Sequence, residues 1–269
     1  MVHYYVQHGE HRRVAGFMYK PFTETLRPLD HTFNVNSTVD LSAIPTGSTF
    51  VWVGVFLLGR VPWLELRKRG VRTVYYQTEY QLDCALTNHS VDEIWDYSLL
   101  NIHNCRGHRN APIQRYVPIS VQTWVPTIRP DPSLGRLDFF GRVIYGRKGC
   151  YAHVDGSWVV KSEYSVWSDT SFNKFARSSA GIFINIHKNC ARLSPVEPRI
   201  PLLLSTGAVV VSVASNLADE REYGGAFMIV SNISNISRID VRAHMQTRNL
   251  SKFRESFDAR EILRRASLL

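Results

Sequence analysis

Short apolar runs alternate with segments of helical character along the first half of the chain. A helix fits Pro62–Arg69, because a proline lies in its first turn, its last turn is basic and Gly70 follows it. A second helix fits Ser98–Cys105. This order of elements is typical of an α/β domain with a parallel sheet. The apolar runs predict strands at Val2–Gln7, Thr32–Asn36, Thr49–Phe56, Thr73–Gln77, Glu93–Tyr97 and Gln114–Pro118.

The second half repeats this pattern after a proline-rich segment. Val125–Gly135 holds three prolines and a glycine and is typical of a linker. Val209–Val213 is apolar without alternation, which indicates a strand covered on both faces. The strands predicted for this half are Leu137–Phe140, Tyr164–Trp167, Gly181–Ile186, Ala208–Val213 and Ala226–Val230. The predicted helices are Arg147–His153, Thr170–Ser178, Val196–Ser205 and a long basic stretch from Ile236 to Ala266.

Two α/β halves joined in this way predict two facing Rossmann-like domains. A ligand is then expected in the cleft between them, at the carboxyl ends of the strands. We expect a first domain over residues 1–125, a linker over 126–135, a second domain over 136–245 and a C-terminal helix over 246–269. Phe253, Phe257, Ile262 and Leu263 recur at roughly helical spacing, so this last helix is expected to pack back towards the first domain.

Composition narrows the class of protein and of partner. With 269 residues, 44% of them hydrophobic and 20% charged, the chain is long and apolar enough for a sizeable core, and whole-chain disorder is excluded. The net charge of +9, carried mostly by arginine, favours anionic partners, because arginine binds phosphate and carboxylate bidentately. Genomic base composition explains a high arginine content equally well.

The cysteines and the apolar stretches bear on location. The four cysteines, at positions 84, 105, 150 and 190, form no CxxC motif and no cluster with zinc spacing, so we expect reduced thiols in a cytosol-like compartment. The N-terminus lacks the apolar region of a signal peptide, and Phe50–Leu58 is too short to span a bilayer. We therefore expect a cytoplasmic protein with no membrane span, in the host cytoplasm if it is viral. On this view the five Asn-x-Ser/Thr sequons stay unmodified, at Asn36, Asn88, Asn232, Asn235 and Asn249.

The second predicted domain carries the most informative motif. The stretch Ile182–His187 is a strand that ends in Asn185 and His187. Glu197 and Arg199 then begin a helix, which a glycine turn and a V-V-V-S strand follow. This order resembles the donor-binding half of GT-B glycosyltransferases. The resemblance implies that Glu197 accepts hydrogen bonds from the ribose of a nucleotide-sugar, while helix N-terminal amides face its diphosphate. Asn185, His187 and Arg199 would belong to the same donor site.

The strand that opens the second domain is also similar to this family. Leu137–Arg142 matches its D-x-x-F-Y-G strand, and a glycine at the end, Gly141, lets the backbone approach a phosphate closely. The cations that follow, Arg142, Arg147 and Lys148, would neutralise the diphosphate leaving group, on which charge develops in the transition state. The alternative is that these cations mark only a solvated helix start.

Polar residues follow two strands of the first half. Gln77 and Glu79 end one strand, and Asp96 lies where the next strand hands over to a helix. The order Y-Q-x-E, D-x-I-W-D-Y-S-x-x-N and Y-V-P looks like the acceptor domain of the same family, which implies acceptor contacts by Gln77 and Asp96. The other members of this motif have structural explanations, Ser98 as a helix N-cap and Trp95 and Tyr97 as core residues.

An inverting transfer needs a base that takes the proton of the acceptor hydroxyl. The candidates in the first domain are Glu79, which has the better motif context, and His8 at the end of the first strand, with Glu10 and His11 nearby. A histidine in such a place is also often structural. A retaining transfer needs mainly stabilisation of the leaving group, and the sequence leaves the stereochemistry open.

The absence of other motifs excludes several enzyme classes. No strand-end DxD motif, phosphate-binding GxxxxGK[ST] loop, GxSxG elbow or GxGxxG loop occurs, which argues against divalent-metal dependence and against NTPase, hydrolase and dehydrogenase activities. The sequence thus predicts a small microbial or viral GT-B glycosyltransferase, without cofactor or metal, that moves a sugar from a UDP- or GDP-sugar to a glycan or glycoprotein. The alternatives are transfer to a modified base in DNA, and a non-catalytic module that binds nucleotide-sugars or nucleic acid.

Overall fold

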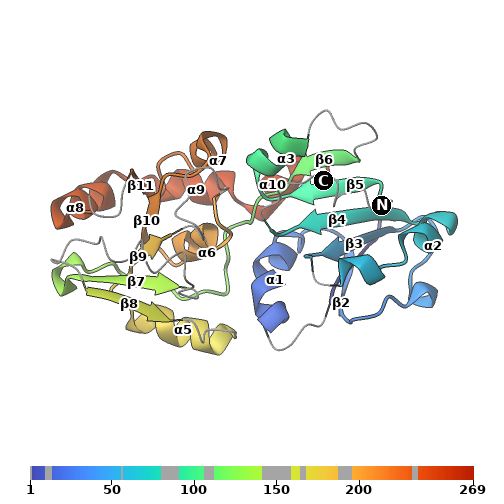
Figure 1. The fold of residues 1–269 in the computed structure, drawn as a ribbon, viewed down its shortest axis with the longest axis horizontal. Helices are drawn as coiled ribbons and strands as arrows, with labels where there is room; N and C mark the ends of the chain where they lie inside the picture. Colours follow the sequence, from blue (N-terminus) through green and yellow to red (C-terminus); the bar gives the residue numbers. More distant parts are fainter. Residues whose placement is uncertain are drawn as a thin grey trace. The chain divides into compact units, whose positions relative to one another are not determined.

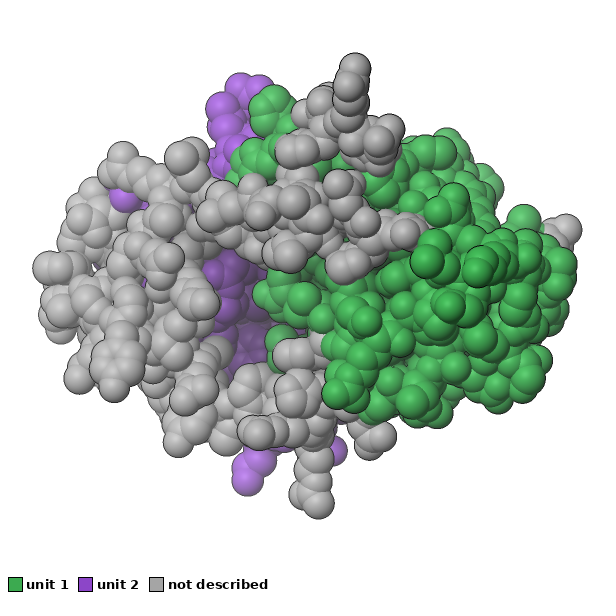
Figure 2. Space-filling model, turned by 45° about the vertical axis from the view of Figure 1, so that its right-hand side comes forward, with its two compact units in different colours: residues 1–120, 257–269 green, residues 121–256 purple. Residues whose placement is uncertain are grey.

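A computed structural model of the chain describes residues 2–9, 14–55, 57–79, 91–105, 112–140, 159–163, 168–186, 196–231 and 236–269. The chain divides into two compact units, which Figure 2 shows in different colours. The first unit comprises Met1–Ser120 and Phe257–Leu269, and the second comprises Val121–Ser256. The C-terminal residues therefore belong to the first unit.

The first unit is built on a six-stranded parallel sheet (Figure 1). In sheet order its strands are β2 (His31–Val35), β1 (Tyr4–His8), β3 (Thr49–Val53), β4 (Arg72–Gln77), β5 (Glu93–Asp96) and β6 (Ile113–Tyr116). Parallel neighbours need crossover connections. The helices of the crossovers are α1 (Val14–Thr25), α2 (Trp63–Lys68) and α3 (Leu99–Cys105), and α10 (Ala259–Arg265) joins the same unit from the C-terminus.

Aromatic side chains fill both faces of this sheet. On one face Trp52 of β3 lies in register with Tyr75 of β4, and both belong to a core cluster with Trp63 of α2. On the other face Tyr76 packs edge-on against Phe22 of α1, with the ring centroids 5.3 Å apart. Because both faces are covered, every residue of the central strand β3 is buried.

The second unit has a five-stranded parallel sheet of the same kind. In sheet order its strands are β11 (Met228–Val230), β10 (Val209–Val213), β9 (Ile182–Asn185), β7 (Arg136–Phe140) and β8 (Val159–Glu163). Every residue of β10 is buried, and Phe183 of β9 packs on Phe175 with the ring centroids 5.8 Å apart. Its helices are α5 (Asp169–Ser178), α6 (Arg199–Ser205), α7 (Leu217–Glu222), α8 (Arg238–Thr247) and α9 (Leu250–Ser256). The predicted α/β class with two Rossmann-like domains is confirmed.

The single long helix predicted from Ile236 to Ala266 is wrong, because this stretch forms α8, α9 and α10. Arg248 has extended backbone after α8. The Asn249 carboxamide then accepts a hydrogen bond from the backbone N–H of Lys252 (2.9 Å) and caps α9. Asp258 caps α10 in the same way by accepting from the N–H of Arg260 (2.9 Å). Two polar N-caps therefore interrupt an otherwise helical sequence.

Among the described α-helices and strands, three were not predicted. The helix α1 contains Pro21, which argues against a helix interior. The helix α7, which follows β10, has only six residues, and four of them are charged. The edge strand β8 has only two apolar residues, so it lacks the apolar run by which strands were predicted. The predicted strand Tyr164–Trp167 and helix Arg147–His153 lie outside the described residues.

The segment predicted as a linker is bound to the second unit. The backbone N–H of Ile128 donates to the carbonyl of Thr206 (2.8 Å), and that of Asp131 donates to the carbonyl of Ala180 (2.8 Å). The division between the units falls after Ser120 rather than after residue 125. A high proline content does not show whether a segment is a free linker or part of a folded unit. Prolines keep their carbonyl groups and the residues between them keep their N–H groups, so such a segment can still form hydrogen bonds with a neighbouring unit.

The cysteine prediction needs correction. Cys105 at the end of α3 is the one cysteine among the described residues, and it is disulfide-bonded rather than reduced. Its side chain is buried. None of the described helices has the length and apolar character needed to cross a bilayer.

Candidate functional site

The carboxyl ends of parallel strands meet at one edge of a sheet, and open α/β sheets bind ligands there. Each unit therefore has one edge at which the predicted site residues can gather. In the first unit His8, Gln77, Glu79 and Asp96 lie at the ends of β1, β4 and β5. In the second unit Asn185 ends β9, Arg199 begins α6, and Glu197 lies two residues before this helix.

Glu79 and Asp96 are linked through Asn101 of α3. The buried Asn101 carboxamide donates from Nδ2 to the backbone carbonyl of Glu79 (3.1 Å) and to Oδ1 of Asp96 (3.0 Å). The same Asp96 oxygen accepts from the backbone N–H of Ser98 (2.9 Å). Glu79 itself is exposed. The edge thus presents one carboxylate to solvent and uses the other, Asp96, to hold the chain that follows β5.

Ser98, Trp95 and Tyr97 have the structural roles that the sequence predicts. The Ser98 hydroxyl accepts from the N–H of Leu100 (3.1 Å) and caps α3. Trp95 and Tyr97 are buried in the core. Asn101 belongs to the same sequence motif, but its link to Glu79 depends on the turn of α3 and was not predicted.

Gln77 is held by a neighbouring tyrosine. Its Oε1 accepts a hydrogen bond from the hydroxyl of Tyr75, and both side chains are buried. Burial raises the pKa of Tyr75 well above its usual value, and the negative charges of Asp96 and Glu79 act in the same direction. Tyr75 therefore stays a neutral donor. The acceptor contacts proposed for Gln77 and Asp96 stay predictions.

His8 is a buried histidine with aromatic neighbours. Its ring centroid lies 5.4 Å from that of Tyr19 and 5.5 Å from that of Phe33, and its Nδ1 lies 3.2 Å from the carbonyl oxygen of Gly9. Burial lowers the pKa of His8, against the hydrogen bond to Gly9, which raises it. A neutral imidazole has the protonation state of a base, although only 2% of His8 is exposed. Its catalytic role stays a prediction.

Glu197 and Arg199 form a charged pair at the edge of the second unit. Arg199 donates from Nη2 to the Glu197 carboxylate and from Nη1 to the carbonyl of Phe140 at the end of β7 (2.7 Å). Its guanidinium carbon also lies 5.2 Å from the ring centroid of Phe139. Both side chains are mostly but not fully buried, with 16% of Glu197 and 14% of Arg199 exposed. The pair fixes the Glu197 carboxylate where β7 ends.

Asn185 supplies a second buried polar group at this edge. Its Nδ2 donates to the hydroxyl of Ser212 on β10 (3.0 Å), which in turn donates to the carbonyl of Val213 (2.9 Å). The Oδ1 of Asn185 is buried and accepts no hydrogen bond from the residues that the structure describes. Leaving such an acceptor unsatisfied costs free energy, so this position favours an additional donor.

Glu220 places a second carboxylate at this edge. Its Oε1 accepts from the backbone N–H of Ser215 and from the Ser215 hydroxyl (3.1 Å), just after β10. Glu220 is the fourth residue of α7, and this contact joins the helix to the segment that follows β10.

Several predicted donor residues lie outside the described residues: Gly141, Arg142, Arg147, Lys148 and His187. Their proposed roles stay predictions. Within the described ranges, no three side chains of His, Cys, Asp or Glu come together in a way that could hold a metal ion.

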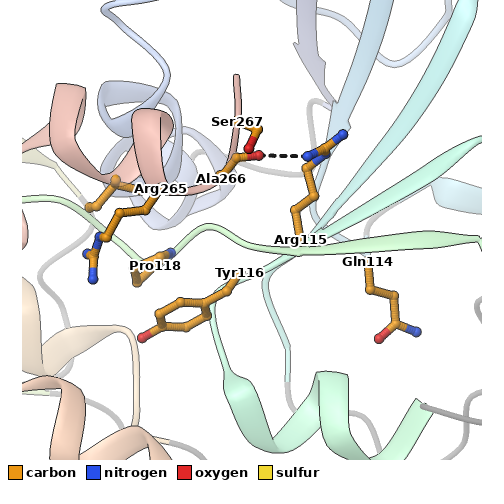
Figure 3. A pocket seen from close by; sticks show the side chains of 8 residues that line it. Gln114, Arg115, Tyr116, Pro118, Arg265, Ala266 and Ser267 are labelled. Carbon is orange, nitrogen blue, oxygen red and sulfur yellow. Dashed lines mark hydrogen bonds between the residues drawn. The ribbon is translucent and has the colours of Figure 1, made fainter. Parts of the chain in front are cut away.

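A pocket of about 270 Å³ lies between β6 and α10 of the first unit (Figure 3). Arg115 donates from Nη1 to the carbonyl of Ala266 (2.8 Å) beside it, and Tyr116, Pro118 and Arg265 contribute to its lining. Of the predicted site residues that the structure describes, none lines this pocket. It results from the return of the C-terminal segment to the first unit.

Comparison with known proteins bears on the fold. No family model matches the sequence, and no curated protein does. Among solved structures, AviGT4, a glycosyltransferase involved in avilamycin A biosynthesis, aligns with a TM-score of 0.59 over 98% of this chain and 96% of its own, at 11% identity. The chain has the GT-B fold.

Other solved structures align less closely over the GT-B fold. OtsA aligns with a TM-score of 0.49 at 10% identity, over 100% of this chain and 97% of its own. An α1,3-fucosyltransferase aligns with a TM-score of 0.49 at 9% identity, over 98% of this chain and 89% of its own. The AviGT4 alignment and the two parallel sheets carry the GT-B assignment, which confirms the fold that the motifs predicted.

Proposed function

We propose that the protein is a glycosyltransferase that moves a sugar from a nucleotide-sugar, a UDP- or GDP-sugar, to a hydroxyl of a glycan or glycoprotein. The observation that carries the proposal is the Glu197–Arg199 pair at the carboxyl edge of the second sheet of a GT-B fold. That AviGT4 is a glycosyltransferase supports the class of reaction. The proposal needs neither a metal nor a cofactor.

The second unit is proposed to bind the donor. In this proposal the Glu197 carboxylate, which pairs with Arg199, accepts hydrogen bonds from the two ribose hydroxyls, because a carboxylate has about four acceptor positions. Arg199 orients the Glu197 carboxylate through this ion pair. Asn185 and His187 complete the donor contacts in this proposal, and Gly141, Arg142, Arg147 and Lys148 bind the diphosphate.

The first unit is proposed to bind the acceptor and to supply the base. The acceptor oxygen forms a bond to the anomeric carbon, the bond from this carbon to the diphosphate breaks, and the nucleoside diphosphate leaves with the electron pair. The acceptor proton passes to the carboxylate of Glu79, an exposed residue whose backbone carbonyl is linked to Asp96 through the Asn101 carboxamide. Glu79 thus fits an inverting transfer, with His8 as the other candidate base.

Donor binding is tested by thermal unfolding with UDP, GDP, CMP and their sugars, each with and without EDTA. A ligand that binds only the folded protein stabilises it by about 2.7 kcal/mol at 100 times its Kd. The proposal predicts a rise in melting temperature with UDP or GDP that EDTA does not change. A rise that EDTA abolishes would contradict metal independence, and no rise with any nucleotide would contradict donor binding.

The role of Glu197 is tested by Glu197→Gln, with Glu255→Gln as the matched control. Glu255 is an exposed carboxylate on α9 of the same unit. Loss of a charged hydrogen bond to the ribose is expected to weaken donor binding by about 1–3 kcal/mol, or roughly 5- to 150-fold, in calorimetric titration. Equal affinities of the two variants would exclude Glu197 as the ribose ligand.

Two predictions from the sequence are not carried into this proposal. A DNA acceptor rests only on the net charge of +9, and no described contact favours it. A cytoplasmic location rested on reduced thiols, and Cys105 is disulfide-bonded.

A further inference from the structure

Asn36, Ser37 and Thr38 form an Asn-x-Thr sequon immediately after the edge strand β2. The side chain of Asn36 is exposed. Its Oδ1 accepts hydrogen bonds from the backbone N–H of Thr38 (3.2 Å) and from the Thr38 hydroxyl (3.3 Å). The amide nitrogen Nδ2, to which a glycan attaches, takes part in neither of these bonds.

The backbone of this sequon is anchored, although its side chain is exposed. The carboxamide of Gln7 donates from Nε2 to the carbonyls of Asn36 and Thr38, both at 2.9 Å. The N–H of Asn36 donates to the carbonyl of His8 (3.2 Å). The folded unit therefore holds the backbone of the sequon in place, while the Asn36 side chain is exposed at its surface.

The surface beside Asn36 has an exposed apolar edge. β2 is the first strand of the described sheet and pairs there with β1 alone. Phe33 and Val35 on this strand are 43% and 46% exposed. Exposed apolar edge strands invite pairing with other chains, and proteins protect them by covering or charging the edge. A glycan on Asn36 would cover this edge.

The disulfide at Cys105 points independently to the same environment. Disulfides form and persist in oxidising compartments, and N-linked glycosylation of sequons is a modification of secreted proteins. Cys105 lies on α3, remote in sequence from β2. From these observations we propose that Asn36 is an N-glycosylation site, in a chain that folds in an oxidising secretory compartment.

The modification is a transfer to the amide nitrogen. A bond forms between Nδ2 of Asn36 and the anomeric carbon of an oligosaccharide carried on a lipid diphosphate. The bond from that carbon to the diphosphate oxygen breaks, Nδ2 loses one proton to a base of the transferring enzyme, and the lipid diphosphate leaves.

Asn249 is the other sequon within the described residues, and it is the weaker candidate. Its Oδ1 accepts from the backbone N–H of Lys252 (2.9 Å), and Ser251 lies inside α9 rather than beside the carboxamide. The inference therefore commits to Asn36.

The test uses the full chain, directed into the secretory pathway of insect cells by a cleavable signal. The purified product is treated with a peptide amidase that removes N-glycans in heavy-oxygen water, which converts each glycosylated asparagine to labelled aspartate for mass spectrometry. The variant Thr38→Ala removes the sequon, whereas Thr38→Ser and Ser37→Ala retain it. These two controls separate loss of the acceptor from poor folding.

We expect labelled aspartate at position 36 in the unaltered chain, in Thr38→Ser and in Ser37→Ala, and its complete loss in Thr38→Ala. Alkylation of the denatured, unreduced protein is expected to leave Cys105 unmodified until a reductant is added. Unlabelled Asn36 in the folded, secreted protein would overturn the site. A free Cys105 thiol in that protein would overturn the oxidising compartment.

Discussion

Gly54 gives a quantitative test of how the edge of the first sheet is packed. It follows β3 with φ of +88°, a conformation that costs other residues about 1–2 kcal/mol. A Cβ on Gly54 would lie 2.1 Å from Cζ of Tyr19, whose side chain is 1% exposed and cannot turn into solvent. Forcing atoms into a packed site costs about a further 1–3 kcal/mol. Gly54→Ala is therefore expected to destabilise the first unit by about 2–5 kcal/mol.

Gly47→Ala is the matched control for this substitution. Gly47 has φ of +80°, and a Cβ added there would meet no atom of the described residues within 4 Å, so this variant carries the backbone cost alone. The assay is urea unfolding of both variants followed by the fluorescence of the buried tryptophans of the first unit. Equal losses of stability would refute the contact between Gly54 and Tyr19.

Three further predictions concern two carboxylates and one histidine. Glu79→Gln is expected to lower kcat/KM by about 10²- to 10⁴-fold, as removal of a general base does. The control Glu65→Gln, at an exposed position on α2, should leave kcat/KM unchanged. Unchanged steady-state rates in both variants would exclude Glu79 as the base. Glu93 is buried, which would raise the pKa of its carboxyl, but hydrogen bonds from Arg115 and Trp95 lower this pKa. Glu93→Ala should therefore lower the free energy of unfolding in urea by about 3–5 kcal/mol. A loss under about 1 kcal/mol would contradict this. Burial and the charge of Arg248 lower the pKa of His244 below 6.5, so the unfolded chain binds the proton more tightly, and stability is full above about pH 6.5 and falls as the pH drops below it. This loss should be smaller in His244→Gln, and identical pH profiles of unfolding would contradict the assignment.

The sequence predicts elements well where one physical signal dominates. The strand β10 is apolar at every position except Ser212, and the structure buries all five of its residues. The prediction of one helix for the C-terminal stretch was wrong because the helical spacing of apolar residues continues through Asn249 and Asp258. Only the hydrogen bonds that these two side chains accept from backbone N–H groups show that they are N-caps. The helix α1 was missed because Pro21 weighs against a helix, although the crossover from β1 to β2 requires an element there.

The sequence predicts which polar residues lie at the strand ends of the candidate site, but it does not predict most of the contacts that these residues make. Asp96 and Gln77 do lie at the carboxyl edge, but the partners that engage them, Asn101 and Tyr75, depend on the three-dimensional arrangement. Glu197 and Arg199 are two residues apart, so their pairing was open to prediction. The hydrogen bond from Arg199 to the carbonyl of Phe140 joins residues 59 positions apart, and the sequence could not predict it.

Turnover of a nucleotide-sugar tests the central claim most directly. The purified chain is incubated with UDP- and GDP-sugars and a panel of glycan acceptors, and the release of nucleoside diphosphate and the glycosylated product are followed by mass spectrometry. We predict release and transfer with one nucleotide class, and a decrease of both at limiting donor in Glu197→Gln but not in Glu255→Gln. No release from any donor by a folded protein, or equal release by the two variants, would contradict the account.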